Sequence, residues 1–170
     1  GGDEVFAGYP NFRRFGRLVR LSAAGAFVPT TLLGRMEKRA ARPGASHRLR
    51  KGVDVARAAG DPAGVYAALR GHLTEAQIAE VLGADVRQAV PLSEAAPLEA
   101  TSSGDAVNDL SRLDLAGYLR NTLLRDTDAM SMASSLEVRV PLLDHHLVEY
   151  ALTLPGSMKR RSGPLSGRDT

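Results

Sequence analysis

The sequence contains no cysteine and no tryptophan, and only 5% of its 170 residues are aromatic. Without cysteine, the chain can form neither a disulfide bond nor a thiolate metal site, and it has no cysteine nucleophile. This composition suits a reducing compartment, so we expect a cytoplasmic location. Because aromatic side chains are scarce, a buried core has to be built largely from Leu, Val and Ala.

Long hydrophobic runs are also missing. No stretch approaches the roughly 20 apolar residues that span a bilayer, and residues 1–8 show neither the basic region nor the apolar run of a signal peptide. We therefore expect no membrane partner. Hydrophobic residues make up 44% and charged residues 24% of the chain, as in ordinary globular proteins, and the length fits one domain with a sizeable core.

Positive charge is unevenly distributed. The formal net charge is only +3, but residues 13–57 contain twelve Lys or Arg against two acids, Glu37 and Asp54. Such a stretch favours either a phosphate or nucleic-acid interface or a solvated arginine-rich face. No aromatic residue lies among the cations between Phe27 and Arg57, as a base-stacking surface would require. We therefore favour the solvated face, and nucleic acid remains the alternative.

The hydrophobic spacing predicts a mainly α-helical chain, with few segments that alternate as strands do. Residues 91–104 are rich in Pro, Ser, Glu, Ala and Gly without apolar periodicity, which indicates an exposed connector. The helices and caps that we expect are a helix over 11–21 capped by Asn11, helices over 30–41, 46–59 and 105–119, a helix that begins at Asp61 and Pro62, a capping box of Thr74 and Gln77, and a helix over 144–154 capped by Asp144.

The segment 129–144 contains the most distinctive charge pattern. Glu137 and Arg139 lie two residues apart, flanked by Leu136, Val138 and Val140. In an extended segment this spacing places both charges on one face and the apolar residues on the other. Such a pair either forms a structural ion pair or contacts the phosphate or carboxylate of a ligand.

Asp3 and Glu4 follow two glycines at the start of the sequence. Glycine allows a backbone to approach a phosphate closely, and a carboxylate beside it can hold Mg²⁺. The competing interpretation is a turn with solvated acids. No Gly-x-Ser-x-Gly elbow, Walker loop or His-Glu-x-x-His helix is present in the sequence to indicate other chemistry.

Two motifs together resemble the synthetase part of glutamine-hydrolysing asparagine synthases. Residues 1–9, Gly-Gly-Asp-Glu-Val-Phe-Ala-Gly-Tyr, are similar to that family's Gly-Gly-Asp-Glu-Leu-Phe-Gly-Gly-Tyr loop. Residues 128–144 are similar to its later Asp-Arg-Met-Ser-Met-Ala and Ser-Leu-Glu-Val-Arg-Val-Pro-Phe-Leu-Asp run. The two motifs stand in the family's order and cover roughly a third of the chain.

The resemblance implies an α/β parent fold of the ATP pyrophosphatase, PP-loop type (adenine nucleotide alpha hydrolase-like). In this family ATP activates aspartate as β-aspartyl-AMP, and ammonia from glutamine displaces AMP. By resemblance, Asp3 binds Mg²⁺ with the pyrophosphate, Gly1 and Gly2 belong to the nucleotide loop, and Glu137 and Arg139 lie near the substrate pocket. Asp128 and Asp144 match positions that we interpret as structural. A homodimer is compatible with the resemblance.

The resemblance also indicates what residues 1–170 omit. We expect them to be the C-terminal part of the synthetase domain, mainly helical because most of the parent's parallel sheet precedes Gly1. The family's Ser-Gly-Gly-x-Asp-Ser phosphate loop and its N-terminal glutaminase domain are not in the sequence, so we expect the chain by itself to be inactive. Relatives that act on other carboxylates, in β-lactam, lasso-peptide or surface-polymer pathways, remain an alternative, as does a non-catalytic nucleic-acid-binding or scaffold protein that uses residues 13–57.

Overall fold

The computed structural model describes residues 1–42, 44–82 and 103–159, and within these ranges the chain is helical and contains no strand. The expectation of a mainly helical chain is confirmed for these residues. The elements are α1 (Gly2–Val5), α2 (Asn11–Ala23), the 3₁₀ turn η1 (Ala24–Phe27), α3 (Thr30–Ala40), α4 (His47–Arg57), α5 (Pro62–Arg70), α6 (Glu75–Leu82), α7 (Ala106–Asp114), the π-helical segment η3 (Leu115–Leu124), α8 (Arg125–Met132), the 3₁₀ turn η4 (Pro141–Leu143), α9 (His145–Thr153) and α10 (Gly156–Lys159).

Side-chain caps mark the starts of α4, α5, α6, α7 and α9. Each cap accepts hydrogen bonds from backbone N–H groups that have no partner within the helix. The capping box of Thr74 and Gln77 is confirmed. The prediction that Asn11 caps the first long helix is wrong, because Pro10 occupies the N-cap position and no side chain caps α2. The other capping side chains are Ser46 on α4, Asp61 on α5, Asp105 on α7 and Asp144 on α9.

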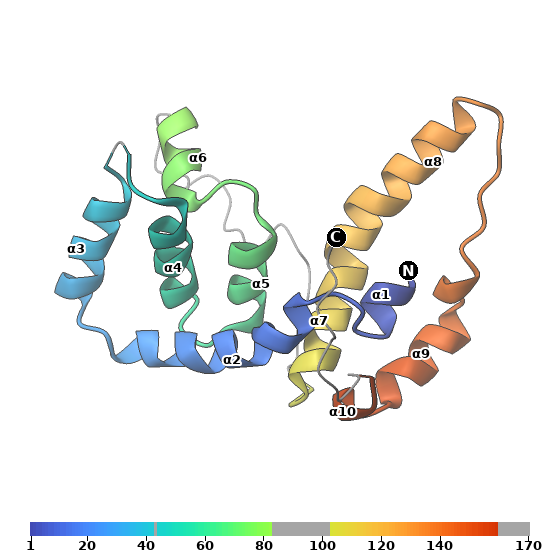
Figure 1. Cartoon of the computed structure of the whole chain (residues 1–170), viewed down its shortest axis with the longest axis horizontal. Coiled ribbons are helices and arrows are strands. Elements are labelled where there is room, and N and C mark those ends of the chain that lie inside the picture. The colour runs from blue at the N-terminus through green and yellow to red at the C-terminus, as the bar shows by residue number, and fades with distance from the viewer. Residues whose placement is uncertain (43, 83–102, 160–170) are drawn as a thin grey trace, which may run out of the picture.

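The helices form two groups that meet at α7. In Figure 1, α3, α4 and α5 stand along α2 on one side, and α1, α9 and α10 lie beside the long α7–η3–α8 helix on the other. The core lies where α2, α5 and α7 pack together. Its buried side chains are Phe12, Phe15, Val65, Tyr66, Val107, Leu110 and Leu113.

A π-helical segment joins α7 to α8, so the helix predicted over 105–119 extends to Met132 instead. The Tyr118 N–H donates to the hydroxyl oxygen of Tyr66 at 3.2 Å. Gly117 allows this approach, since a Cβ there would lie 2.9 Å from the same oxygen. A side chain that takes a backbone donor from the helix disturbs its hydrogen-bond ladder locally, which accounts for the widened turns at this point.

The segment 129–144 begins within a helix and is not extended throughout. Met130 and Met132 lie in α8, and the chain follows an irregular path from residue 136 to residue 140. Residues 91–102 of the expected connector lie outside the described residues. Among the described residues, no helix is both long and apolar enough to cross a membrane.

Candidate functional site

The structure brings the two motifs together, although residues 10–127 lie between them in the sequence. A Cβ built on Gly1 would lie 2.8 Å from Cγ of Leu143, and one built on Gly2 would lie 2.9 Å from Cδ1 of Leu142. The glycine-rich turn therefore packs directly against η4, and Figure 1 shows α1 beside α9 and η3. Side chains larger than glycine would separate these two surfaces.

Asp3 lies on the exposed side of α1, where a metal ion or a phosphate could reach it. Its backbone oxygen accepts the Gly8 N–H at 2.9 Å. A Cβ built on Gly8 would lie only 2.1 Å from Oδ1 of Asp3. The missing side chain at Gly8 therefore makes the space that the Asp3 carboxylate occupies.

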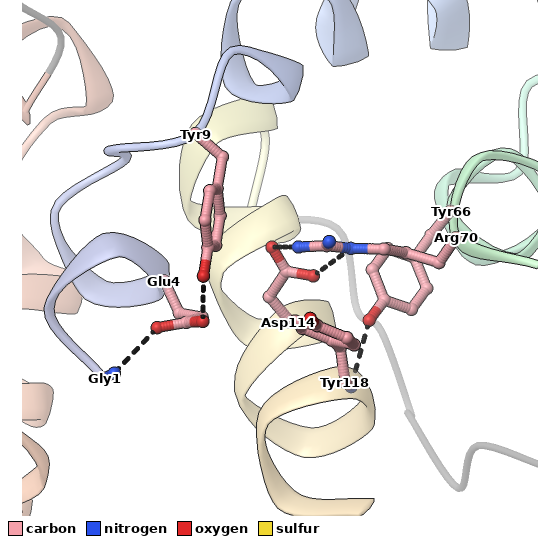
Figure 2. Close-up of polar contacts among 7 residues, drawn as sticks. All are labelled: Gly1, Glu4, Tyr9, Tyr66, Arg70, Asp114 and Tyr118. Carbon is pink, nitrogen blue, oxygen red and sulfur yellow. Dashed lines mark hydrogen bonds and ion pairs between the residues drawn. The ribbon is translucent and has the colours of Figure 1, made fainter. Parts of the chain in front are cut away.

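Glu4 points the other way and is 0% exposed. Its Oε1 accepts the Tyr9 hydroxyl at 2.9 Å (Figure 2). Of the two adjacent acids, only Asp3 is placed to meet a ligand from solvent.

Glu137 and Arg139 form an ion pair with each other. Their side chains are 71% and 84% exposed, and the flanking Leu136, Val138 and Val140 are also exposed. Both the charged and the apolar side chains of this segment are therefore exposed. Within the described ranges, no hydrogen bond or ion pair joins either side chain to Asp3, and the segment leads away from η4 toward the far end of α8 (Figure 1).

The sequence as a whole matches the asparagine synthase family over residues 1–165. The chain belongs to that family. The family match extends through the middle of the chain, beyond the two motifs that carry the resemblance. It confirms the family that residues 1–9 and 128–144 indicate.

Curated relatives match shorter stretches. The chain is 35% identical over 63 residues to asparagine synthetase [glutamine-hydrolyzing] 1 of Bacillus subtilis, a match that covers 37% of the chain and 10% of that protein. It is 46% identical over 59 residues to synthetase 3 of the same bacterium, covering 35% and 9%. It is 38% identical over 86 residues to a putative asparagine synthetase of Mycobacterium tuberculosis, covering 45% and 13%. The matches thus span about a tenth of each relative, and no solved structure gives a significant match.

Asp3 is the side chain of the motif at residues 1–9 that could hold a metal ion from the solvent side. In the part of the chain that the structure describes, no group of three or more His, Asp or Glu side chains is placed to hold a metal ion. Proteins commonly bind Mg²⁺ through one or two carboxylates together with water and substrate phosphates. A single exposed carboxylate in a glycine-lined turn suits this mode, and Asp3 is that carboxylate.

Sequence reasoning missed the polar cluster beside Tyr9. Arg70 of α5 donates to both oxygens of Asp114, at 2.9 and 2.8 Å, and Asp114 is 1% exposed. The Arg70 guanidinium also lies over the rings of Tyr118 and Tyr9, 4.3 and 5.2 Å from their centroids. The pair joins residues 44 positions apart in the sequence, so local spacing gave no signal for it (Figure 2).

The basic stretch is divided between structural and solvated arginines. Arg57 pairs with Glu37 at 2.6 Å, which ties α4 to α3, and Arg50 lies 3.6 Å from Glu80. The arginines of α2, at positions 13, 14, 17 and 20, are exposed or at the helix surface and form no ion pair within the described residues. This pattern is that of an arginine-rich solvated face.

The buried tyrosines predict how stability changes at high pH. Burial, together with the Glu4 carboxylate, raises the pKa of Tyr9 to about 12, and burial with Asp114 raises that of Tyr66 to about 12. The folded protein therefore holds these protons more tightly than the unfolded chain, whose tyrosines titrate at about 10. This contribution to stability is complete below pH 10 and is lost between about pH 10 and 12.

We expect the unfolding free energy, measured in urea at a series of pH values, to fall across that window, and to fall less in Tyr9→Phe. An ultraviolet titration of the folded chain should show two of its four tyrosines ionising late. Ionisation of all four near pH 10 in the folded protein would contradict the prediction.

Proposed function

We propose that this chain is the C-terminal part of a synthetase domain that amidates aspartate to asparagine. ATP would activate the aspartate side chain as β-aspartyl-AMP with release of pyrophosphate, and ammonia derived from glutamine would displace AMP. The observation that carries the proposal is the family match over residues 1–165. The two motifs of that family also pack against each other, Gly1 against Leu143 and Gly2 against Leu142. The names of the matched relatives support aspartate as the acceptor.

Asp3 has the central role among the residues of this chain. Its carboxylate would hold Mg²⁺ together with the pyrophosphate, and the ion would offset the negative charge that develops on the leaving group. Gly1 and Gly2, which carry no side chains, would let the backbone approach the nucleotide. Glu137 and Arg139 are exposed in this structure and free to turn toward a substrate carboxylate, which a guanidinium binds with two hydrogen bonds.

Further segments would complete the enzyme. We infer that the parallel sheet with its PP-loop and a glutaminase domain lie outside residues 1–170, since the relatives are many times longer than the matched stretches. The cytoplasmic location and the homodimer belong to the same proposal. Residues 1–170 alone should release no pyrophosphate from ATP and aspartate, and measurable release would show that the phosphate-binding loop is dispensable.

The assignment of Asp3 is tested in the full-length synthetase that carries this segment. Asp3→Asn should slow aspartate-dependent exchange of pyrophosphate into ATP by about 100- to 1000-fold, the size expected when one group that stabilises developing charge is removed. The KM for aspartate should change far less. Asp128→Asn removes an exposed acid from the second motif and is the matched control, with exchange close to wild type. An Asp3→Asn enzyme with an unchanged rate at saturating Mg²⁺ would refute the assignment.

A further inference from the structure

We propose that Tyr9, with Arg70 stacked on its ring, is a positioning residue that sets the direction of the Asp3 carboxylate. The inference rests on the proposed role of Asp3 and adds residues from outside the metal site. It also gives the Arg70–Asp114 pair a functional reason to be next to the N-terminal motif. The contacts run from Asp114 through Arg70 and Tyr9 to Glu4, the residue after Asp3 (Figure 2).

Consecutive residues on a helical turn point about 100° apart, so fixing one side chain fixes the direction of its neighbour. Glu4 is buried, and its Oε1 is held by the Tyr9 hydroxyl at 2.9 Å. Asp3 precedes it on the same turn and faces solvent. Without the Tyr9 hydroxyl, Glu4 loses its side-chain hydrogen bond from Tyr9, and the turn that carries the Asp3 carboxylate is held less firmly.

A second contact closes residues 3–8 into a ring. The Gly8 N–H donates to the Asp3 backbone oxygen at 2.9 Å, and the Asp3 carboxylate packs against the bare Cα of Gly8. Ala7, between them, has a φ of 59°, a left-handed conformation that costs a non-glycine residue energy. Such a turn persists only when surrounding contacts hold it, and the Glu4–Tyr9 hydrogen bond is one of them.

Arg70 holds the Tyr9 ring from the side of α5. A guanidinium within about 6 Å of an aromatic centroid is attracted to the ring face, and Arg70 meets this condition for both Tyr9 and Tyr118. Its two hydrogen bonds to the buried Asp114 leave it little freedom to move. Tyr9 is therefore held at its ring by a fixed cation and at its hydroxyl by a buried carboxylate.

The decisive variant is Tyr9→Phe, which keeps the ring for Arg70 and removes only the hydroxyl. In the full-length synthetase, we expect the apparent KM for Mg²⁺ in pyrophosphate exchange to rise about tenfold, as for the loss of one hydrogen bond to a charged group. The KM for aspartate should stay within about twofold. Tyr9→Leu, which also loses the ring, should raise the Mg²⁺ requirement further.

Tyr66→Phe is the matched control. It removes a buried hydroxyl from the same cluster, one that accepts from the Tyr118 N–H and does not contact Glu4. It should lower stability and leave the KM for Mg²⁺ unchanged. Equal shifts of that KM in Tyr9→Phe and Tyr66→Phe would reduce the effect to general destabilisation and overturn the proposal.

Amide hydrogen exchange on the 170-residue chain separates this inference from the proposed function. Tyr9→Phe should speed exchange at Phe6 and Gly8, whose N–H groups are bonded within the turn, by about tenfold, and Tyr66→Phe should not. Unchanged exchange in Tyr9→Phe overturns the positioning role, whatever the enzyme does. If amide exchange is faster in Tyr9→Phe but the Asp3→Asn enzyme keeps the wild-type rate of pyrophosphate exchange, the proposed role of Asp3 is wrong and the positioning of the turn by Tyr9 stands.

Discussion

Replacing Phe15 by alanine is expected to lower the free energy of unfolding by about 3–5 kcal/mol. Phe15 lies on the inward face of α2, is 1% exposed, and packs in the core that α2 shares with α5 and α7. Alanine would lose the transfer free energy of the ring and leave a cavity where three helices meet. Urea unfolding followed by circular dichroism measures the loss.

Phe27→Ala provides a control of identical chemistry. Phe27 is 88% exposed at the end of η1, so its removal should change stability by no more than about 0.5 kcal/mol. Phe15→Leu covers the case in which Phe15→Ala fails to fold, and should cost clearly less because it refills most of the space. Similar losses for Phe15→Ala and Phe27→Ala would contradict the position assigned to the core.

The parts of the fold that depend on nearby residues could be predicted from the sequence. A cap requires only a short polar side chain two or three residues before the N–H that it accepts from, which is why Asp61, Thr74 and Asp144 were assigned correctly. Asn11 shows the limit of this reasoning. The chain enters α2 through Pro10, already in a helical conformation, so Asn11 lies inside the first turn, where its side chain does not act as a cap.

The parts that depend on distant residues could not be predicted. The π-helical segment needs a hydroxyl from Tyr66 to meet a backbone N–H that is 52 residues away, and the Arg70–Asp114 pair spans 44. Hydrophobic spacing did predict a helix over 105–119, and Val107, Leu110 and Leu113 of α7 are buried. It gave no sign that the same helix buries polar side chains as well, and these are Asn108, Asp109, Ser111 and Asp114.

The candidate site could be predicted from the sequence only in part. Residues 1–9 and 128–144 identified the family and indicated Asp3 as the metal ligand, but their spacing could not show that the turn directs Glu4 inward. Ala7 illustrates a departure with a physical consequence. The family motif has glycine at this position, and the structure gives Ala7 a positive φ, so this chain keeps the turn at a cost that glycine would avoid.

Gly156→Ala is the second substitution for which we expect a large loss, about 2–4 kcal/mol from overpacking and a lost hydrogen bond to a charged group. A Cβ there would lie 2.4 Å from Oδ1 of Asp105 and 2.5 Å from Cβ of Val107. The Gly156 N–H also donates to the other oxygen of Asp105 at 2.7 Å. Because Asp105 caps α7 with its Oδ1, a methyl group at this position would disturb both the cap and the docking of α10.

The contacts between α10 and α7 indicate which residues Gly156→Ala should loosen. Lys159 donates to Oδ1 of Asn108 at 2.7 Å, and Asn108 in turn donates to the Leu154 carbonyl at 3.1 Å. Gly156→Ala should therefore speed amide exchange at Val107 and Asn108 as well as lower stability in urea. Gly34→Ala is the control, because a Cβ on Gly34 in α3 would meet nothing within 4 Å. There alanine should raise stability by up to about 1 kcal/mol through helix propensity, and a change of the same sign at both glycines would contradict the close packing of Gly156 against α7.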